Sequence, residues 1–184
     1  MPWHFRFGYS IASLLLFRIV WGFAGGRWSR FASFVYSPAT VVRYLKGSKQ
    51  PEHAVGHTPL GAVSVFAILA FLAAQVGTGV FSDDEIAASG PMTKFASNAA
   101  VSIATHYHIG IGKYVLFGLV VMHITAIFIY LLRRQNLLRP MIGGDKSTEA
   151  EVQGSRDDSR SRTTAAIVFA LCAGLVTGLV RLAG

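Results

Sequence analysis

Long runs of apolar residues alternate with shorter polar segments along this chain of 184 residues. Four runs are apolar over nearly their whole length and cover residues 3–24, 60–81, 109–132 and 163–180. A helix needs about 20 such residues to cross the hydrocarbon core of a bilayer. The pattern therefore predicts an all-α integral membrane protein with four transmembrane helices, the last and shortest of which lies in a C-terminal helical segment, 163–184.

The charged residues lie mainly between these runs and predict the orientation of the chain. Five Lys or Arg residues and one acid precede the second run, and seven Lys or Arg residues precede the fourth. The segment 82–107 instead carries Asp83, Asp84 and Glu85 with Lys94 as its one basic residue. Because basic loops stay in the cytoplasm, we expect the acidic segment on the periplasmic face.

The same pattern predicts how the chain is divided. The first three runs form one domain, 1–142, and a polar stretch rich in acids and arginine, 143–162, is typical of a linker. With the basic segments inside, the first helix runs inward and Met1 lies outside. A short tail can be translocated, and a chain that has lost a preceding helix fits equally well, so both interpretations stay open.

Composition agrees with a membrane protein and excludes other classes. The chain is 52% hydrophobic and 14% charged, whereas about 25% of the residues in a soluble domain are charged. A single cysteine, Cys172, excludes a disulfide framework and a CxxC redox pair. The net charge of +8 follows from basic loops between apolar runs, so we attribute it to membrane topology and exclude a nucleic-acid partner.

Polar side chains inside the first run are functional candidates, since a charge near the centre of a membrane helix costs at least about 2.5 kcal/mol. His4 lies at the outer end and Arg18 follows fourteen residues later. That spacing places both on nearly the same helix face, about 21 Å apart. Gly8 and Gly22 lie one turn below them and keep this face shallow, so that a flat macrocycle or another helix could lie against it.

The third run carries histidines at two levels. His106 and His108 lie at its outer end, and His123 follows fifteen residues after His108. In a continuous helix that spacing gives about 22 Å along the axis and an offset of about 60° around it. His106 is further off the face of His123, so His108 is the better inward-facing candidate, and a surface role for His106 stays open.

Since the first and third helices run in the same direction, their polar residues fall at matching levels. His4 and His108 are level near the outer surface, and two neutral imidazoles from facing helices are a common means of holding haem iron. Arg18 and His123 are level nearer the cytoplasm and indicate half of a second site, with one iron ligand and one cation for the haem propionates. Histidines at a membrane surface can equally contact only headgroups or loops, and His57 either contacts a propionate or has no role.

Several motifs together resemble the bacterial cytochrome b561 and nickel–iron-hydrogenase cytochrome b family. They are HxxxGY followed by LLFRIVWGF, GHTPLG before the second run, the histidines of the third run, and LLRRQNLLRPM after it. The resemblance covers residues 3–142, and the fourth helix resembles an extra C-terminal helix of some members. It implies a transmembrane four-helix haem bundle that commonly holds two haems b.

By this resemblance, His4 and His108 ligate an outer haem, while His123 ligates an inner haem whose propionates face Arg18. The family pattern begins one helix earlier, with a histidine that nothing here matches. The inner haem therefore needs a preceding helix or a partner for its second ligand. The family also separates its paired histidines by about one residue less than His108 and His123, which leaves His106 as an alternative ligand.

The expected function is therefore electron transfer by haem b across or within the bacterial inner membrane, without bond-making catalysis. The resemblance implies membrane lipid and a quinone, a c-type cytochrome or a redox-enzyme subunit as partners, and a homodimer could supply the missing helix. The alternative function is a membrane anchor subunit of a redox complex with incomplete haem or none. A third class is a small transporter that uses His123 and Arg18 as an intramembrane polar pair.

Overall fold

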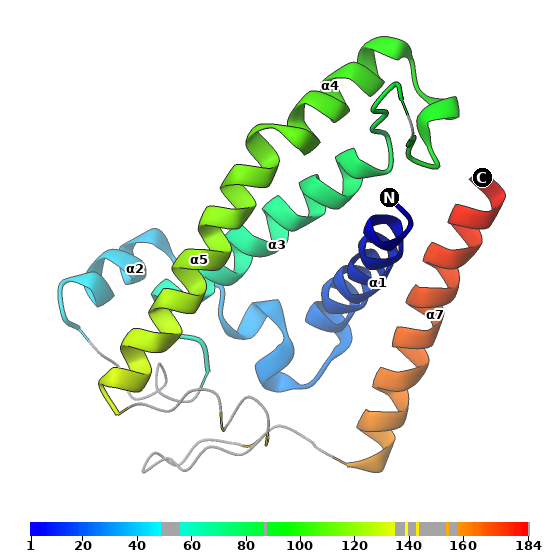
Figure 1. Cartoon of the computed structure of the whole chain (residues 1–184). Helices are drawn as coiled ribbons and strands as arrows, with labels where there is room; N and C mark the ends of the chain where they lie inside the picture. Colours follow the sequence, from blue (N-terminus) through cyan, green and yellow to red (C-terminus); the bar gives the residue numbers. More distant parts are fainter. Residues whose placement is uncertain are drawn as a thin grey trace.

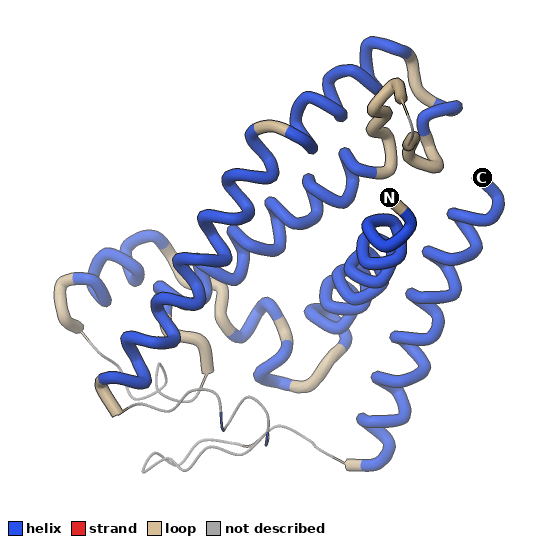
Figure 2. The backbone as a smooth tube through the Cα atoms, viewed as in Figure 1, coloured by secondary structure: helices blue, strands red, loops and turns tan. Residues whose placement is uncertain are grey.

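All regular elements in the described part of the computed structural model are helices (Figure 2). The structure describes residues 1–48, 56–86, 88–134 and 158–183, together with the single positions 139, 143 and 154. Within these residues the only strand-like pairing is an isolated bridge between Asp83 and Ser89.

Four helical segments are long and apolar enough to cross a membrane. They are α1 (Pro2–Ala24), α3 (Pro59–Gly79), the segment Asn98–Leu132 and α7 (Ser159–Ala183). The predicted runs 3–24, 109–132 and 163–180 lie within their helices, whereas α3 ends two residues before the end of the run 60–81. The prediction of an all-α multi-pass membrane protein is confirmed. Many large apolar side chains on their surfaces are exposed, among them Phe117, at 68%, as expected where lipid covers a helix.

The third membrane segment differs from the prediction because it begins inside the expected loop 82–107. Helix α4 (Asn98–Ile109) has Ser97 as its N-cap, and the Ser97 hydroxyl accepts a hydrogen bond from the main-chain N–H of Ala100. Its serine, threonine and histidine side chains lower its hydropathy, so the apolar pattern does not predict it as part of a membrane helix. The Ser97 N-cap is nevertheless a recognised helix start signal.

A break at Gly110 separates α4 from α5 (Ile111–Leu132). The backbone there leaves the helical conformation, with φ −99° and ψ −116°. The predicted offset of about 60° between His108 and His123 assumed one unbroken helix. The break lies between the two residues, so this premise does not hold.

Two further expectations about boundaries change. Helix α7 begins at Ser159, four residues before the predicted start and within the predicted linker 143–162, most of which lies outside the described residues. It has 25 residues, so it is not the shortest span. A short helix, α2 (Pro38–Leu45), lies between α1 and α3 with Ser37 as its N-cap.

The membrane helices pack side by side in the order α7, α1, α3 and α5 (Figure 1). Helices α1 and α4–α5 run in one direction, and α3 and α7 run in the other (Figure 1). The N-terminus, α4 and the end of α3 therefore lie at one end of the molecule, called the outer end below. The segment with α2 and the basic residues that follow α5 lie at the opposite, basic end.

An aromatic cluster forms the most buried part of the described chain, at the basic end. The Phe34 side chain is 1% exposed. Its ring contacts His57, Phe66 and Phe31 with centroid separations of 4.4, 5.3 and 5.9 Å. This cluster ties the segment after α1 to the start of α3.

Candidate functional site

The structure brings His4 of α1 and His108 of α4 into contact at the outer end. Their ring centroids are 5.9 Å apart and their planes are nearly perpendicular, at 87°. An imidazole nitrogen binds its metal at about 2 Å, so two imidazoles on opposite faces of one haem iron hold their ring centres about 6 Å apart. The separation of the two rings therefore fits bis-histidine ligation of a haem.

The His108 ring is held by a hydrogen bond to α3. Its Nδ1 lies 2.8 Å from the main-chain carbonyl oxygen of Gln75. Because a carbonyl only accepts hydrogen bonds, Nδ1 carries the proton and donates it, and Nε2 keeps its lone pair. Metal-ligating histidines are commonly oriented by this type of hydrogen bond.

Two residues of α3, Gln75 and Gly79, contact His108, and neither was predicted as a site residue from the sequence. The Gln75 side-chain Nε2 donates to the main-chain carbonyl of His108 at 2.9 Å. Gly79 leaves room for the His108 ring, since a Cβ at Gly79 would lie 2.7 Å from Cε1. An amide within an apolar helix, one turn before a glycine, was the available sequence signal.

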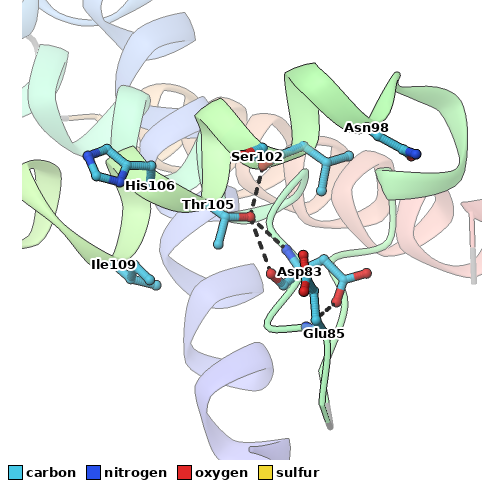
Figure 3. Close-up of a pocket in the computed structure, with 8 residues that line it drawn as sticks. Asp83, Glu85, Asn98, Ser102, Thr105, His106 and Ile109 are labelled. Carbon is cyan, nitrogen blue, oxygen red and sulfur yellow. Dashed lines mark hydrogen bonds between the residues drawn. The ribbon is translucent and has the colours of Figure 1, made fainter.

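His106 faces a different environment from His108. Two residues along a helix correspond to a rotation of about 200°, and His106 is exposed while His108 is half-buried. His106 lines a surface cavity of about 470 Å³ together with Asp83, Glu85 and Asn98. In Figure 3 its ring points away from both carboxylates. The structure thus places His108, and not His106, beside His4.

The two glycines of α1 that were expected to shape a groove have different surroundings. A Cβ at Gly8 would have no atom within 4 Å, so this face of α1 is open next to His4. A Cβ at Gly22 would overlap the Phe31 ring. The expectation that both glycines leave a shallow groove is therefore wrong for Gly22, because an aromatic ring from the following segment fills it.

Arg18 also has partners that the sequence did not predict. Its guanidinium donates to the main-chain carbonyl of Ser29 at 3.2 Å and lies over the rings of Phe31 and Phe34, 4.8 and 5.9 Å from their centroids. A guanidinium has five N–H donors, so these contacts do not use all of them. The fold therefore satisfies part of the Arg18 guanidinium without a carboxylate.

His57 precedes α3 and belongs to the same cluster at the basic end. Its main-chain carbonyl accepts a hydrogen bond from the Tyr36 hydroxyl at 2.9 Å. Burial, and secondarily the positive charge of Arg18, lower the pKa of His57 below its ordinary value of 6.5. The neutral imidazole is therefore the favoured form, and it carries no positive charge with which to attract an anion such as a haem propionate.

His123 of α5 is half-buried, and within the described part of the chain no hydrogen bond or ring contact of its side chain is found. The residues described also show no direct interaction between His123 and Arg18. Arg18 and His123, which were expected at the same level of the membrane, thus make no direct contact. No group of three or more His, Cys, Asp or Glu side chains among these residues could hold a metal ion, so the two-histidine pair is the candidate centre.

Comparisons with known proteins bear on the family of the chain. The family model described as prokaryotic cytochrome b561 matches residues 1–144. A protein named probable Ni/Fe-hydrogenase B-type cytochrome subunit, from Bradyrhizobium diazoefficiens, is 27% identical over an alignment that covers 78% of this chain. The chain spans 64% of the length of that relative. No solved structure matches the chain.

Proposed function

The chain belongs to the prokaryotic cytochrome b561 family, and we propose that it is a membrane electron carrier whose His4 and His108 hold a haem b near the outer end. The resemblance to this family that the sequence indicated is confirmed. Members of the family carry electrons within membranes and are not enzymes. The haem, its ligands and the redox partners are the parts that we propose.

The observation that supports the proposal most directly is the His4–His108 pair. The ring separation of 5.9 Å matches the value of about 6 Å that two imidazoles need across one iron. A lone histidine on a membrane helix is usually an interfacial side chain, but two in contact from helices 104 residues apart in sequence require a common reason. One shared metal supplies that reason.

The residues around the pair have defined tasks in this proposal. The Gln75 carbonyl accepts the His108 Nδ1 proton, which leaves Nε2 as the ligand atom. Gly8, one turn below His4, offers an open helix face against which a flat macrocycle can lie. When bound, haem b accepts and releases one electron at a time. His106 contributes no ligand.

A second haem at His123 remains part of the proposal through the family resemblance. A half-buried imidazole without a hydrogen-bond partner is unfavourable in an apolar environment, and ligation to a metal would remove that cost. Its other ligand would come from a preceding helix or a partner chain. Arg18 would face the propionates with the N–H groups that do not bind Ser29.

We also propose the setting in which the electrons move. The described basic residues that directly follow α1 and α5 lie at one end of the molecule, so by the positive-inside rule that end faces the cytoplasm of a bacterium and the acidic loop faces the periplasm. A quinone, a c-type cytochrome or a redox enzyme would exchange electrons with the haem. The hydrogenase subunit relative favours a redox enzyme as partner.

A reduced-minus-oxidised optical spectrum of the full chain, expressed with sufficient haem and purified in detergent, tests the proposal. We expect a b-type α band. His4→Ala and His108→Ala should each abolish the same spectral component, because each removes one ligand of a single iron. His106→Ala is the matched control on the same helix and should keep the full band. A wild-type chain without the band refutes the proposal.

The runner-up function is a membrane anchor subunit that docks a redox enzyme with incomplete haem or none. The name of the hydrogenase subunit relative is the observation that favours it. Under this alternative, the His4 and His108 variants would still bring the partner enzyme to the membrane fraction, and no band would be lost because none was present.

A further inference from the structure

Helix α3 contributes no histidine to the site, but it contacts His108 directly. The Cε1 and Nδ1 atoms of the His108 ring lie 2.7 and 3.0 Å from the position of a Cβ at Gly79. Such distances do not accommodate a side chain, so the ring occupies the space that the missing Cβ leaves.

Gln75, one turn earlier on α3, makes two hydrogen bonds to the same residue. Its main-chain carbonyl accepts from the imidazole Nδ1 of His108, and its side-chain Nε2 donates to the main-chain carbonyl of His108. The second contact has a structural origin. The helix breaks at Gly110, and carbonyls in the last turn before a break lack their normal partners.

The Gln75 side chain is costly at this position. Its Oε1 is buried and has no hydrogen-bond partner among the described residues, and an unsatisfied buried acceptor destabilises a fold. An apolar residue of similar size would avoid that penalty. The amide therefore has a role that an apolar residue cannot fill, and the one hydrogen bond that its side chain makes within the described residues is with His108.

We propose that Gln75 and Gly79 are positioning residues that fix the orientation and tautomer of the His108 ligand. This inference rests on the proposed function, since it assumes that His108 binds haem. Gly79 lets the ring lie against α3, where Nδ1 meets the Gln75 carbonyl, and the Gln75 amide holds the main chain of His108 at the break. Helix α3 thus sets how strongly a ligand carried by α4 binds.

The direction of the effect follows from the hydrogen bond. Donation from Nδ1–H to a carbonyl increases the basicity of Nε2. A more basic ligand favours the ferric over the ferrous state. Loss of the hydrogen bond should therefore weaken ferric haem binding most and raise the midpoint potential.

Gly79→Ala and Gly77→Ala form a matched pair that tests the inference. A Cβ at Gly77 meets no atom within 4 Å, so this variant adds the same methyl group to the same helix without touching His108. At Gly79 the ring has to move by about 1 Å to restore normal contact. We expect Gly79→Ala to weaken haem binding by about 10- to 100-fold and Gly77→Ala to leave it unchanged.

The measurements are haemin titration into the haem-depleted full chain, the low-spin signal of the ferric form, and the midpoint potential. If a tenfold loss is confined to the ferric state, the potential rises by about 59 mV. A variant that merely loosened the fold would lower the thermal midpoint of the haem-depleted chain. A raised potential with an unchanged thermal midpoint therefore indicates an effect on the ligand.

Gln75→Met keeps the test decisive if Gly79→Ala does not fold. Methionine preserves the length of the side chain and removes the N–H donor to His108. The main-chain carbonyl at position 75 remains, but the main chain of His108 is no longer held at the break, so the ring moves away from that carbonyl. We therefore expect weaker haem binding and a raised potential, in the same direction as for Gly79→Ala.

The outcomes separate this inference from the proposed function. One outcome overturns only the role of α3. In it the wild type binds haem, His108→Ala does not, and both Gly79→Ala and Gln75→Met keep the wild-type affinity and potential. A wild-type chain that binds no haem overturns the proposed function instead.

Discussion

The clearest contrast in the structure is between two glycines on one helix, and it leads to a quantitative prediction about Gly8 and Gly22. Sequence spacing treats them alike, one turn below His4 and one turn below Arg18. In the structure the face of Gly8 is open, whereas that of Gly22 is filled by the Phe31 ring. Substitution at the two positions should therefore affect different properties.

The expected magnitudes follow from these surroundings. Gly8→Ala meets no atom within 4 Å, so the haem-depleted chain should be unchanged or more stable by up to about 1 kcal/mol, the helix propensity difference between the two residues. Gly22→Ala forces a methyl group into the Phe31 ring, and overpacking of this kind costs about 1–3 kcal/mol. If a macrocycle lies against the open face, Gly8→Leu should lower haem affinity at least about tenfold, or about 1.4 kcal/mol.

The assay measures two quantities on each variant in the same detergent. Thermal unfolding of the haem-depleted chain reports on helix packing, and haem bound per chain at limiting haemin reports on the site. We expect Gly8→Leu to lose haem but not stability, and Gly22→Ala to lose stability first. Full haem retention by Gly8→Leu would refute the reasoning that places the macrocycle against this face, while an undisturbed melting temperature in Gly22→Ala would contradict the Phe31 contact.

Two further predictions concern the cluster at the basic end. Burial and Arg18 lower the pKa of His57 below 6.5, so the unfolded chain binds more protons and the free energy of unfolding should fall as the pH drops through about 6.5. Thermal midpoints measured between about pH 5 and pH 8 should show this dependence. A His57→Gln variant with the same pH dependence would disprove its assignment to His57. Phe34→Ala should lower the free energy of unfolding by about 3–5 kcal/mol, because that side chain is 1% exposed. Phe95→Ala, at a position that is 68% exposed, should stay within about 0.5 kcal/mol of the wild type in chemical denaturation. Equal losses of stability in the two variants would contradict the packing of Phe34.

Much of the fold could be predicted because membrane insertion depends on local properties of the chain. A run of about 20 apolar residues forms a helix in lipid wherever the rest of the protein lies, and four such runs are present. The level of a residue within the membrane also follows from the sequence, since each crossing reverses direction. The contact of His4 with His108 could be anticipated for that reason.

The boundaries were less predictable where polar residues enter a helix. Helix α4 was assigned to a loop because its serine, threonine and histidine side chains lower the hydropathy of the segment. The break at Gly110 could not be predicted from the sequence either, because glycine is tolerated within membrane helices. A single glycine does not reveal whether the backbone continues as a helix or changes direction.

The sequence by itself thus determined the four membrane helices and their alternating directions, and it predicted the level of each histidine, because these depend on the order of residues along one dimension. Only the tertiary structure decided which faces meet: that Gln75 and Gly79 of α3 receive His108, that Phe31 fills the face of Gly22, and that Arg18 binds Ser29. The physical reason is that α3 is apolar around almost its whole circumference, so apart from Gln75 its pattern does not indicate its rotation about its own axis. That rotation is set by side-chain packing and by a few polar contacts, and these exist only once the helices are assembled.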